Sequence, residues 1–106
     1  MTETYTVTAT LWVWTSPNAP ASWHFQTIEG KAAEAISALA LMRRLEFGKK
    51  RGWGSMKVSA TIGGTTWQTS IFPDKSGGCW LLPVKAAVRK AEGLMTGDQV
   101  EVTLTV

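Results

Sequence analysis

A chain of 106 residues can bury one hydrophobic core and leaves no room for a second, so a single domain spanning residues 1–106 is expected. Hydrophobic residues make up 44% of the chain and charged residues 18%, a balance that excludes a disordered protein. No apolar run approaches the roughly 20 residues that cross a bilayer, the amino terminus reads as a strand rather than an export signal, and Cys79 is the single cysteine. These features predict a cytoplasmic protein with no disulfide and no membrane partner.

The first half of the chain predicts two strands and a helix. Thr4 to Trp14 alternates between an apolar face and a face of threonines followed by Trp12 and Trp14. Turn residues follow from Ser16 to Pro20, and Ser22 to Ile28 is short, aromatic and β-prone. Alanine-rich helical spacing then predicts a helix that begins near Glu29 or Gly30 and ends between Met42 and Phe47.

The second half predicts the same kinds of element. Two alternating runs, Met56 to Ile62 and Thr65 to Phe72, flank a Gly-Gly pair that is typical of a tight hairpin. A short strand over Cys79 to Leu82 precedes a helix predicted to run from Pro83 to about Glu92. The apolar stripe of this helix is predicted at Val84, Ala87, Val88 and Ala91, with Lys85, Arg89 and Glu92 on the opposite side. A last alternating strand follows Gly97 and Asp98.

The two halves share a pattern in which a strand that contains a tryptophan precedes a helix. In this alignment Ser22–Phe25 corresponds to Cys79–Leu82, so Trp23 corresponds to Trp80. Six twisted strands close naturally into a small barrel, which leaves no exposed sheet edge. We therefore predict a mainly β (α+β) domain: a closed six-stranded β-barrel with two short helices and an internal two-fold pseudo-repeat.

Positive charge is concentrated in the middle of the chain. Six of the eleven basic residues fall between positions 43 and 57, with Glu46 as the one acidic residue among them: Arg43, Arg44, Lys49, Lys50, Arg51 and Lys57. Such a cluster attracts phosphates or an acidic partner, and it also serves simply as a solvated loop that keeps a small protein soluble. Both interpretations stay open.

No residue pattern indicates a catalytic, cofactor-binding or metal-binding site. His24 is the sole histidine and has no metal ligand at suitable spacing, so a half-buried structural role is expected. Cys79 beside Trp80 is expected to be an inert thiol. Among the six tryptophans, Trp67 and Trp80 are expected in the core, whereas Trp12, Trp14 and Trp53 are candidates for exposed or groove positions.

Several motifs carry a resemblance to known families. Gly52–Ser55, Thr61–Gly64, Thr69–Pro73 and Leu82–Lys90 resemble a family of small bacterial proteins classed as a domain of unknown function, whose members sometimes precede a bacteriocin-protection domain of the YdeI/OmpD-associated type. This resemblance covers nearly the whole chain and implies a double-split β-barrel with no established activity. Leu82 to Val102 is also similar to the swapped-hairpin units of AbrB-type regulators, which bind DNA as dimers.

These observations rank three functional hypotheses. The first is a non-catalytic binding or interaction module, as a monomer or a homodimer. The second is a nucleic-acid binder that uses Trp53 for stacking and the following cations for phosphates: Arg43, Arg44, Lys49, Lys50, Arg51, Lys85 and Arg89. An enzyme ranks third, because no acid–base pair is visible at any spacing.

Overall fold

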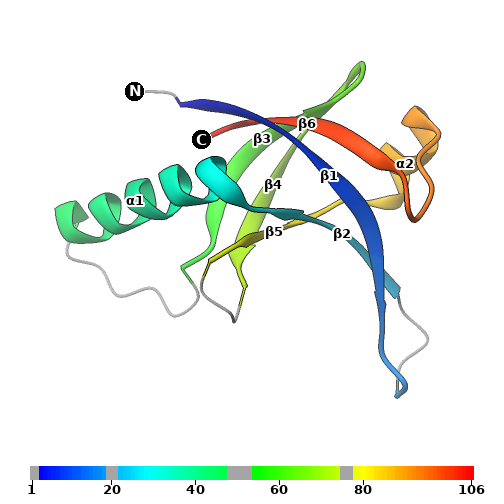
Figure 1. Cartoon of the computed structure of the whole chain (residues 1–106), viewed down its shortest axis with the longest axis horizontal. Helices are drawn as coiled ribbons and strands as arrows, with labels where there is room; N and C mark the ends of the chain where they lie inside the picture. The colour runs from blue at the N-terminus through cyan, green and yellow to red at the C-terminus, as the bar shows by residue number, and fades with distance from the viewer. Residues whose placement is uncertain (1–2, 19–21, 48–53, 75–77) are drawn as a thin grey trace.

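The computed structural model describes residues 3–18, 22–47, 54–74 and 78–106. Its elements in chain order are β1 (Thr4–Thr15), β2 (Ser22–Ile28), α1 (Gly30–Phe47), β3 (Met56–Ile62), β4 (Thr65–Pro73), β5 (Trp80–Pro83), α2 (Ala86–Glu92) and β6 (Gln99–Thr105). The strands form a closed antiparallel barrel in the order β1-β2-β5-β4-β3-β6 (Figure 1). The predicted mainly β, six-stranded barrel with two helices is confirmed.

The barrel interior is apolar because each strand alternates between the two faces. Fully buried residues such as Leu11, Ile71 and Leu104 point inward, and the threonines between the inward residues of β1 are exposed. The hairpin between β3 and β4 turns at Gly63 and Gly64, as predicted, and Gly63 has the positive φ of 58° that such a turn requires.

The two halves of the chain are related by a pseudo-two-fold axis. The barrel order maps onto itself when β1 is exchanged with β4, β2 with β5 and β3 with β6. Because the two helices start at Gly30 and Ala86, the axis is placed between Gln26 and Leu82, which lie four residues before these starts, pair across the β2–β5 ladder and are both 0% exposed. Counting two residues back from each of them makes His24 the counterpart of Trp80.

The expected correspondence of Trp23 with Trp80 is therefore wrong by one residue. Trp23 is 54% exposed and Trp80 is 4% exposed. Since successive strand residues point to opposite faces, an offset of one position exchanges the inner and outer faces of the barrel. Matching the tryptophans by residue type alone concealed this reversal.

Helix α2 begins three residues later than predicted, because Pro83 belongs to β5. Val84 N–H donates to His24 C=O at 2.9 Å, so the β2–β5 pairing extends past Pro83. Successive N–H groups of β5 point alternately to β2 and to β4, so the nitrogen of Pro83 faces β4. The described pairing of β5 with β4 stops at Leu81. The missing proline N–H costs no ladder bond at that position. Lys85 is still extended (φ −70°, ψ 160°), and the helix starts at Ala86.

The predicted apolar face of α2 is only partly correct. Val84 and Val88 are buried, but Ala87 and Ala91 are exposed. Arg89 and Glu92, predicted on the solvent side, are half-buried and bond to the barrel through Val84 C=O and the Thr65 hydroxyl. Polar bonds set the orientation of this short helix, and hydrophobic periodicity does not register such bonds.

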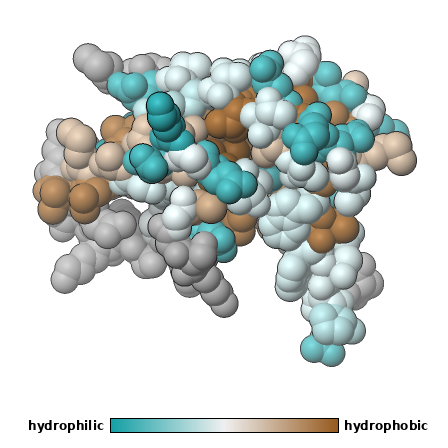
Figure 2. All heavy atoms as spheres, viewed as in Figure 1, coloured by the Kyte–Doolittle hydropathy of each residue, from teal (hydrophilic) through white to brown (hydrophobic). Residues whose placement is uncertain are grey.

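The helices lie at opposite ends of the molecule (Figure 1). Helix α1 packs through Ala33 and Ile36, while the apolar side chains of Leu41, Met42 and Leu45 are exposed near its carboxyl end. Hydrophobic atoms are visible at that end of the surface in Figure 2. Neither described helix combines the length and apolar character needed to cross a membrane.

Candidate functional site

A pocket of about 300 Å³ lies beside α2. Three parts of the fold line it: the start of β2, the middle of β4, and the connection from β5 into α2. The lining residues are Ser22, Trp23, His24, Trp67, Gln68, Thr69, Pro83, Val84, Lys85, Ala86 and Arg89. This volume is at the small end of the range for ligand sites in proteins. We call this cavity the α2 pocket.

His24 is the residue of the α2 pocket whose pKa is shifted. It shares the inner face of β2 with Gln26, and its Nδ1 is buried without a hydrogen-bond partner among the described residues. Burial disfavours the charged imidazolium, and the positive charge of Arg89 disfavours it further, so the pKa of His24 lies below its ordinary value of 6.5. The ring is consequently neutral at pH 7, and Nδ1 retains an unused capacity for one hydrogen bond.

Arg89 supplies a fixed positive charge next to this imidazole. Its Nε donates to the carbonyl of Val84 at 3.2 Å, which anchors the guanidinium at the pocket wall. In the described part of the chain the two Nη groups of Arg89 have no hydrogen-bond partner. These two groups carry most of the N–H donors of the guanidinium. Lys85 adds a second, exposed cation at the pocket rim. No carboxylate is present among the described lining residues, so the local charge favours an anion.

The pseudo-two-fold axis explains why the pocket occurs at this end of the barrel. Trp80, the counterpart of His24, is buried beneath α1 and donates from Nε1 to the Ser37 hydroxyl at 2.9 Å. Its buried indole occupies the inward strand position at the α1 end that corresponds to His24 at the α2 end. The smaller imidazole of His24 fills less of the space at the other end.

The predicted cations fall into two separate groups. Lys85 and Arg89 meet at the α2 pocket. Arg43 is half-buried on α1, at the opposite end of the molecule, and Arg44 follows it on the same helix (Figure 1). The remaining predicted residues, Lys49, Lys50, Arg51 and Trp53, lie outside the described residues.

The tryptophans were largely placed correctly from the sequence. Trp67 and Trp80 are buried, and Trp14 is 49% exposed, as predicted. Trp12 is half-buried, because its ring packs on Phe25 at 5.1 Å between centroids and its Nε1 donates to Thr27.

A second surface depression is acidic, and two of its three carboxylates, those of Glu92 and Asp98, accept hydrogen bonds from the protein. It lies between the β3–β4 turn and the start of β6, with a volume of about 500 Å³. Glu92 accepts a hydrogen bond from the Thr65 hydroxyl at 2.5 Å, and Asp98 accepts one from Met95 N–H at 2.9 Å. The first bond connects α2 to β4, and the second closes the turn between α2 and β6.

Sequence reasoning assigned His24 a structural role and did not anticipate a pocket. One signal was available: Ser22, His24 and Gln26 place polar groups at alternate positions of a strand whose inner face must enter the barrel. Polar residues on an inward face indicate either an internal hydrogen bond or an opening to a ligand. Gln26 illustrates the first case, and His24 lines the α2 pocket.

The geometry defines the class of this protein as a duplicated, closed β-barrel flanked by two helices, with a cation-lined pocket at one end. A family model described as a domain of unknown function (DUF1905) matches residues 8–104, and the chain belongs to this family. None of the curated proteins matches the chain. The resemblance drawn from the motifs is thus confirmed for the family and for the barrel.

Proposed function

We propose that this domain is a non-catalytic binding module and that the α2 pocket binds a small anionic ligand. The observation that carries the proposal is the pairing of Arg89 with His24. A guanidinium is held in place through its Nε, and beside it an imidazole has an unpartnered buried Nδ1. A ligand oxygen beside Arg89 accepts charge-assisted hydrogen bonds from it, and it also satisfies the buried imidazole nitrogen once the side chains that cover Nδ1 move aside.

The pocket walls restrict the size and character of the ligand. A volume of about 300 Å³ suits a small molecule, and Trp67, Pro83 and Val84 provide apolar surface beside the two cations. An anionic group joined to a small aromatic body fits this lining. Benzoate is therefore a suitable probe, with neutral benzamide as its control and inorganic phosphate as a probe of charge alone.

The arrangement around His24 supports binding rather than catalysis. Activation of a hydroxyl nucleophile needs a hydrogen bond between that hydroxyl and a base. In the described residues no serine or threonine hydroxyl is bonded to either ring nitrogen of His24, although Ser22 and Thr69 line the same pocket.

The proposal is tested by titrating the ¹⁵N-labelled protein with benzoate, benzamide and phosphate and recording amide shifts. Saturable shifts are expected for benzoate at His24, Thr69 and Lys85, with weaker binding of benzamide. Arg89→Gln is expected to weaken benzoate binding about 10- to 100-fold, the effect of losing a charge-assisted hydrogen bond. Lys57→Gln is the matched control, because it removes a cation from an exposed position of β3 that is not part of the pocket lining.

Two results contradict the proposal. One is the absence of saturable shifts at the pocket with both anions. The other is equal weakening of benzoate binding by Arg89→Gln and Lys57→Gln, since that outcome reflects net charge and not a built site.

Nucleic-acid binding is the second candidate function. It is favoured by the formal net charge of +3 and by the proximity of Lys85 and Arg89 to the exposed Trp23. Affinity for DNA or RNA is then expected to fall with salt by about 0.9 log units per log unit of salt for each duplex phosphate neutralised. Replacing Lys49, Lys50 and Arg51 together by alanine tests the central cluster, and Lys85→Gln with Arg89→Gln tests the pocket cations. No binding at low salt eliminates this candidate.

A further inference from the structure

The outer end of β1 carries an open backbone edge. Strand β1 pairs with β6 as far as Thr10, opposite Gln99. Leu11 then completes that side of the ladder, because its N–H donates to Asp98 C=O at 2.9 Å and its C=O accepts from Gly97 N–H at 2.8 Å. β1 continues to Thr15 in pairing with β2 alone, and no strand of the described chain lies on its other side. This two-stranded ribbon projects beyond the barrel (Figure 1).

The direction of the backbone groups on this edge follows from strand alternation. The N–H and C=O of Leu11 point toward β6, so those of Val13 and Thr15 point the same way, and those of Trp12 and Trp14 point toward β2. Val13 and Thr15 therefore present donors and acceptors to the open side. Both residues are exposed.

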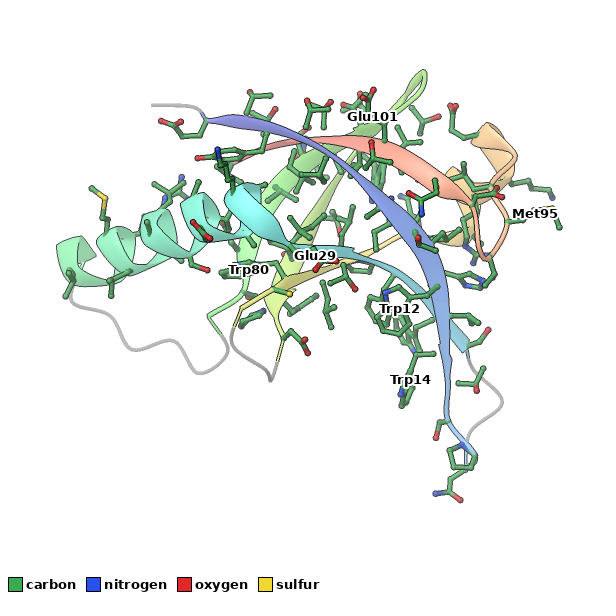
Figure 3. The ribbon with its side chains drawn as sticks, in the orientation of Figure 1. Trp12, Trp14, Glu29, Trp80, Met95 and Glu101 are labelled. Carbon is green, nitrogen blue, oxygen red and sulfur yellow. The ribbon has the colours of Figure 1, made fainter. Side chains whose placement is uncertain are left out.

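One face of the ribbon is aromatic. Trp12 is paired with Phe25 and Trp14 with Trp23, and paired residues share a face. Trp14 and Trp23 are 49% and 54% exposed, and Figure 3 shows Trp12 and Trp14 on the same side of β1. An exposed aromatic face beside an unpaired edge is a common starting point for strand addition.

The ribbon also lacks the charges that usually protect a strand edge. Thr10 to Asn18 contains no charged side chain, and neither does the facing strand from Ser22 to Gln26, in which His24 is neutral. Elsewhere the net charge of +3 opposes association of two copies. The ribbon itself adds no charge to this repulsion.

The geometry points to antiparallel pairing of two copies of this chain through their β1 edges, with the two-fold axis at Trp14. In this register Val13 of one copy faces Thr15 of the other, and every N–H on the open edge meets a carbonyl. An axis at Val13 instead places Thr15 opposite Leu11, whose groups are already bonded. The Trp14 rings of the two copies become neighbours, flanked by Trp23 of each copy. Trp23 also lines the α2 pocket, but the pairing of the two edges needs no ligand there.

Sedimentation velocity from micromolar to millimolar concentration tests the proposal. The unmodified protein is expected to approach the dimer mass. Trp14→Lys places like charges next to each other at the axis and is expected to raise the dimer dissociation constant at least about tenfold. Thr8→Lys is the matched control: it adds the same charge to an exposed position of β1 that is already paired, opposite Glu101, and it leaves dimerisation unchanged.

Val13→Pro is a second variant that keeps the fold. It removes an N–H that faces the open edge, a position where strands tolerate proline, and it leaves the bonds to β2 intact. Hydrogen exchange adds a residue-specific readout: the amides of Val13 and Thr15 become protected as concentration rises, whereas those of Trp12 and Trp14 are protected throughout.

A protein that is monomeric at millimolar concentration overturns the proposal. A dimer that both variants leave unchanged does so as well, because association then uses another surface. Binding of an extended peptide along this edge by a protein that remains monomeric assigns the edge to a different partner and also overturns it.

Discussion

Replacement of Gln26 by leucine tests the internal symmetry of the barrel. Gln26 is fully buried, and its Nε2 donates to Ala9 C=O at 3.1 Å and to Val100 C=O at 3.0 Å, two residues that pair across the β1–β6 ladder. Its Oε1 is buried without a partner among the described residues. The symmetry-related position holds Leu82, which is also fully buried.

The opposing energies for Gln26→Leu are of similar size. Loss of two hydrogen bonds costs about 1–3 kcal/mol in total, and removal of an unsatisfied buried oxygen returns about 1–3 kcal/mol. The Gln26→Leu variant is therefore expected within about 2 kcal/mol of the unmodified protein. Gln26→Ala loses the same bonds and leaves a cavity, so it is expected to be about 3–5 kcal/mol less stable than Gln26→Leu.

Urea unfolding and calorimetry measure this difference between the two variants. For a domain of this size it corresponds to melting temperatures roughly 10–20 °C apart. Equal destabilisation by both variants refutes the reasoning, because the amide would then be indispensable and the unpaired Oε1 would carry no penalty.

Three further predictions concern single residues. The pKa of His24 is lowered in the folded state, so the folded protein binds fewer protons than the unfolded chain. The free energy of unfolding is therefore expected to fall as the pH drops through about 6.5 toward the folded pKa. In unfolding measured between about pH 8 and pH 5, His24→Gln is expected to remove this slope. Gly63→Ala places a Cβ on Glu92 Oε1 at a residue with positive φ and disturbs the bond between Glu92 and Thr65, so the free energy of unfolding in urea is expected to fall by about 1–3 kcal/mol. Gly64→Ala is the control, because its Cβ meets nothing closer than 4.0 Å. An equal fall for Gly64→Ala contradicts the role given to Gly63. Cys79→Ala is expected to change the free energy of unfolding by less than about 1 kcal/mol. It is also expected to leave anion binding intact, because Cys79 lies outside the pocket lining. Loss of binding in a folded Cys79→Ala variant shows that the thiol is not inert.

The strands were predictable because their faces differ in chemistry. The alternation of threonine with apolar residues in β1 and of polar with apolar residues in β6 fixes both the strand and its inner face. The hairpin at Gly63 was predictable for a similar reason, since a tight turn needs residues that accept positive φ. Local rules of this kind determined most of the barrel.

The α2 region was less predictable because contacts distant in sequence determine it. Pro83 reads as a helix start, but a bond from Val84 N–H to His24 C=O keeps the chain extended there. Glu92, at the end of α2, accepts a hydrogen bond from the Thr65 hydroxyl of β4, whereas Arg89 bonds locally to the Val84 carbonyl in the β5–α2 connection. The α2 pocket follows from the same contacts, so recognising it required the strand register as well as the sequence.

The divergence of the two halves accounts for the position of the candidate site. At each of the two symmetry-related ends of the barrel, the equivalent inward strand position has to be filled by a side chain. At one end a large aromatic side chain fills it. Trp80 does so beneath α1, with its indole N–H satisfied by Ser37. At the other end the equivalent residue is His24, which is smaller, retains an unpaired ring nitrogen and lies next to Arg89. Exchanging a space-filling aromatic residue for a titratable one sacrifices apolar burial and leaves a buried polar atom unsatisfied, both of which destabilise a domain of this size. A ligand that bonds to Nδ1 and Arg89 removes the second of these costs, which is why binding at this end is a physically consistent role for the barrel.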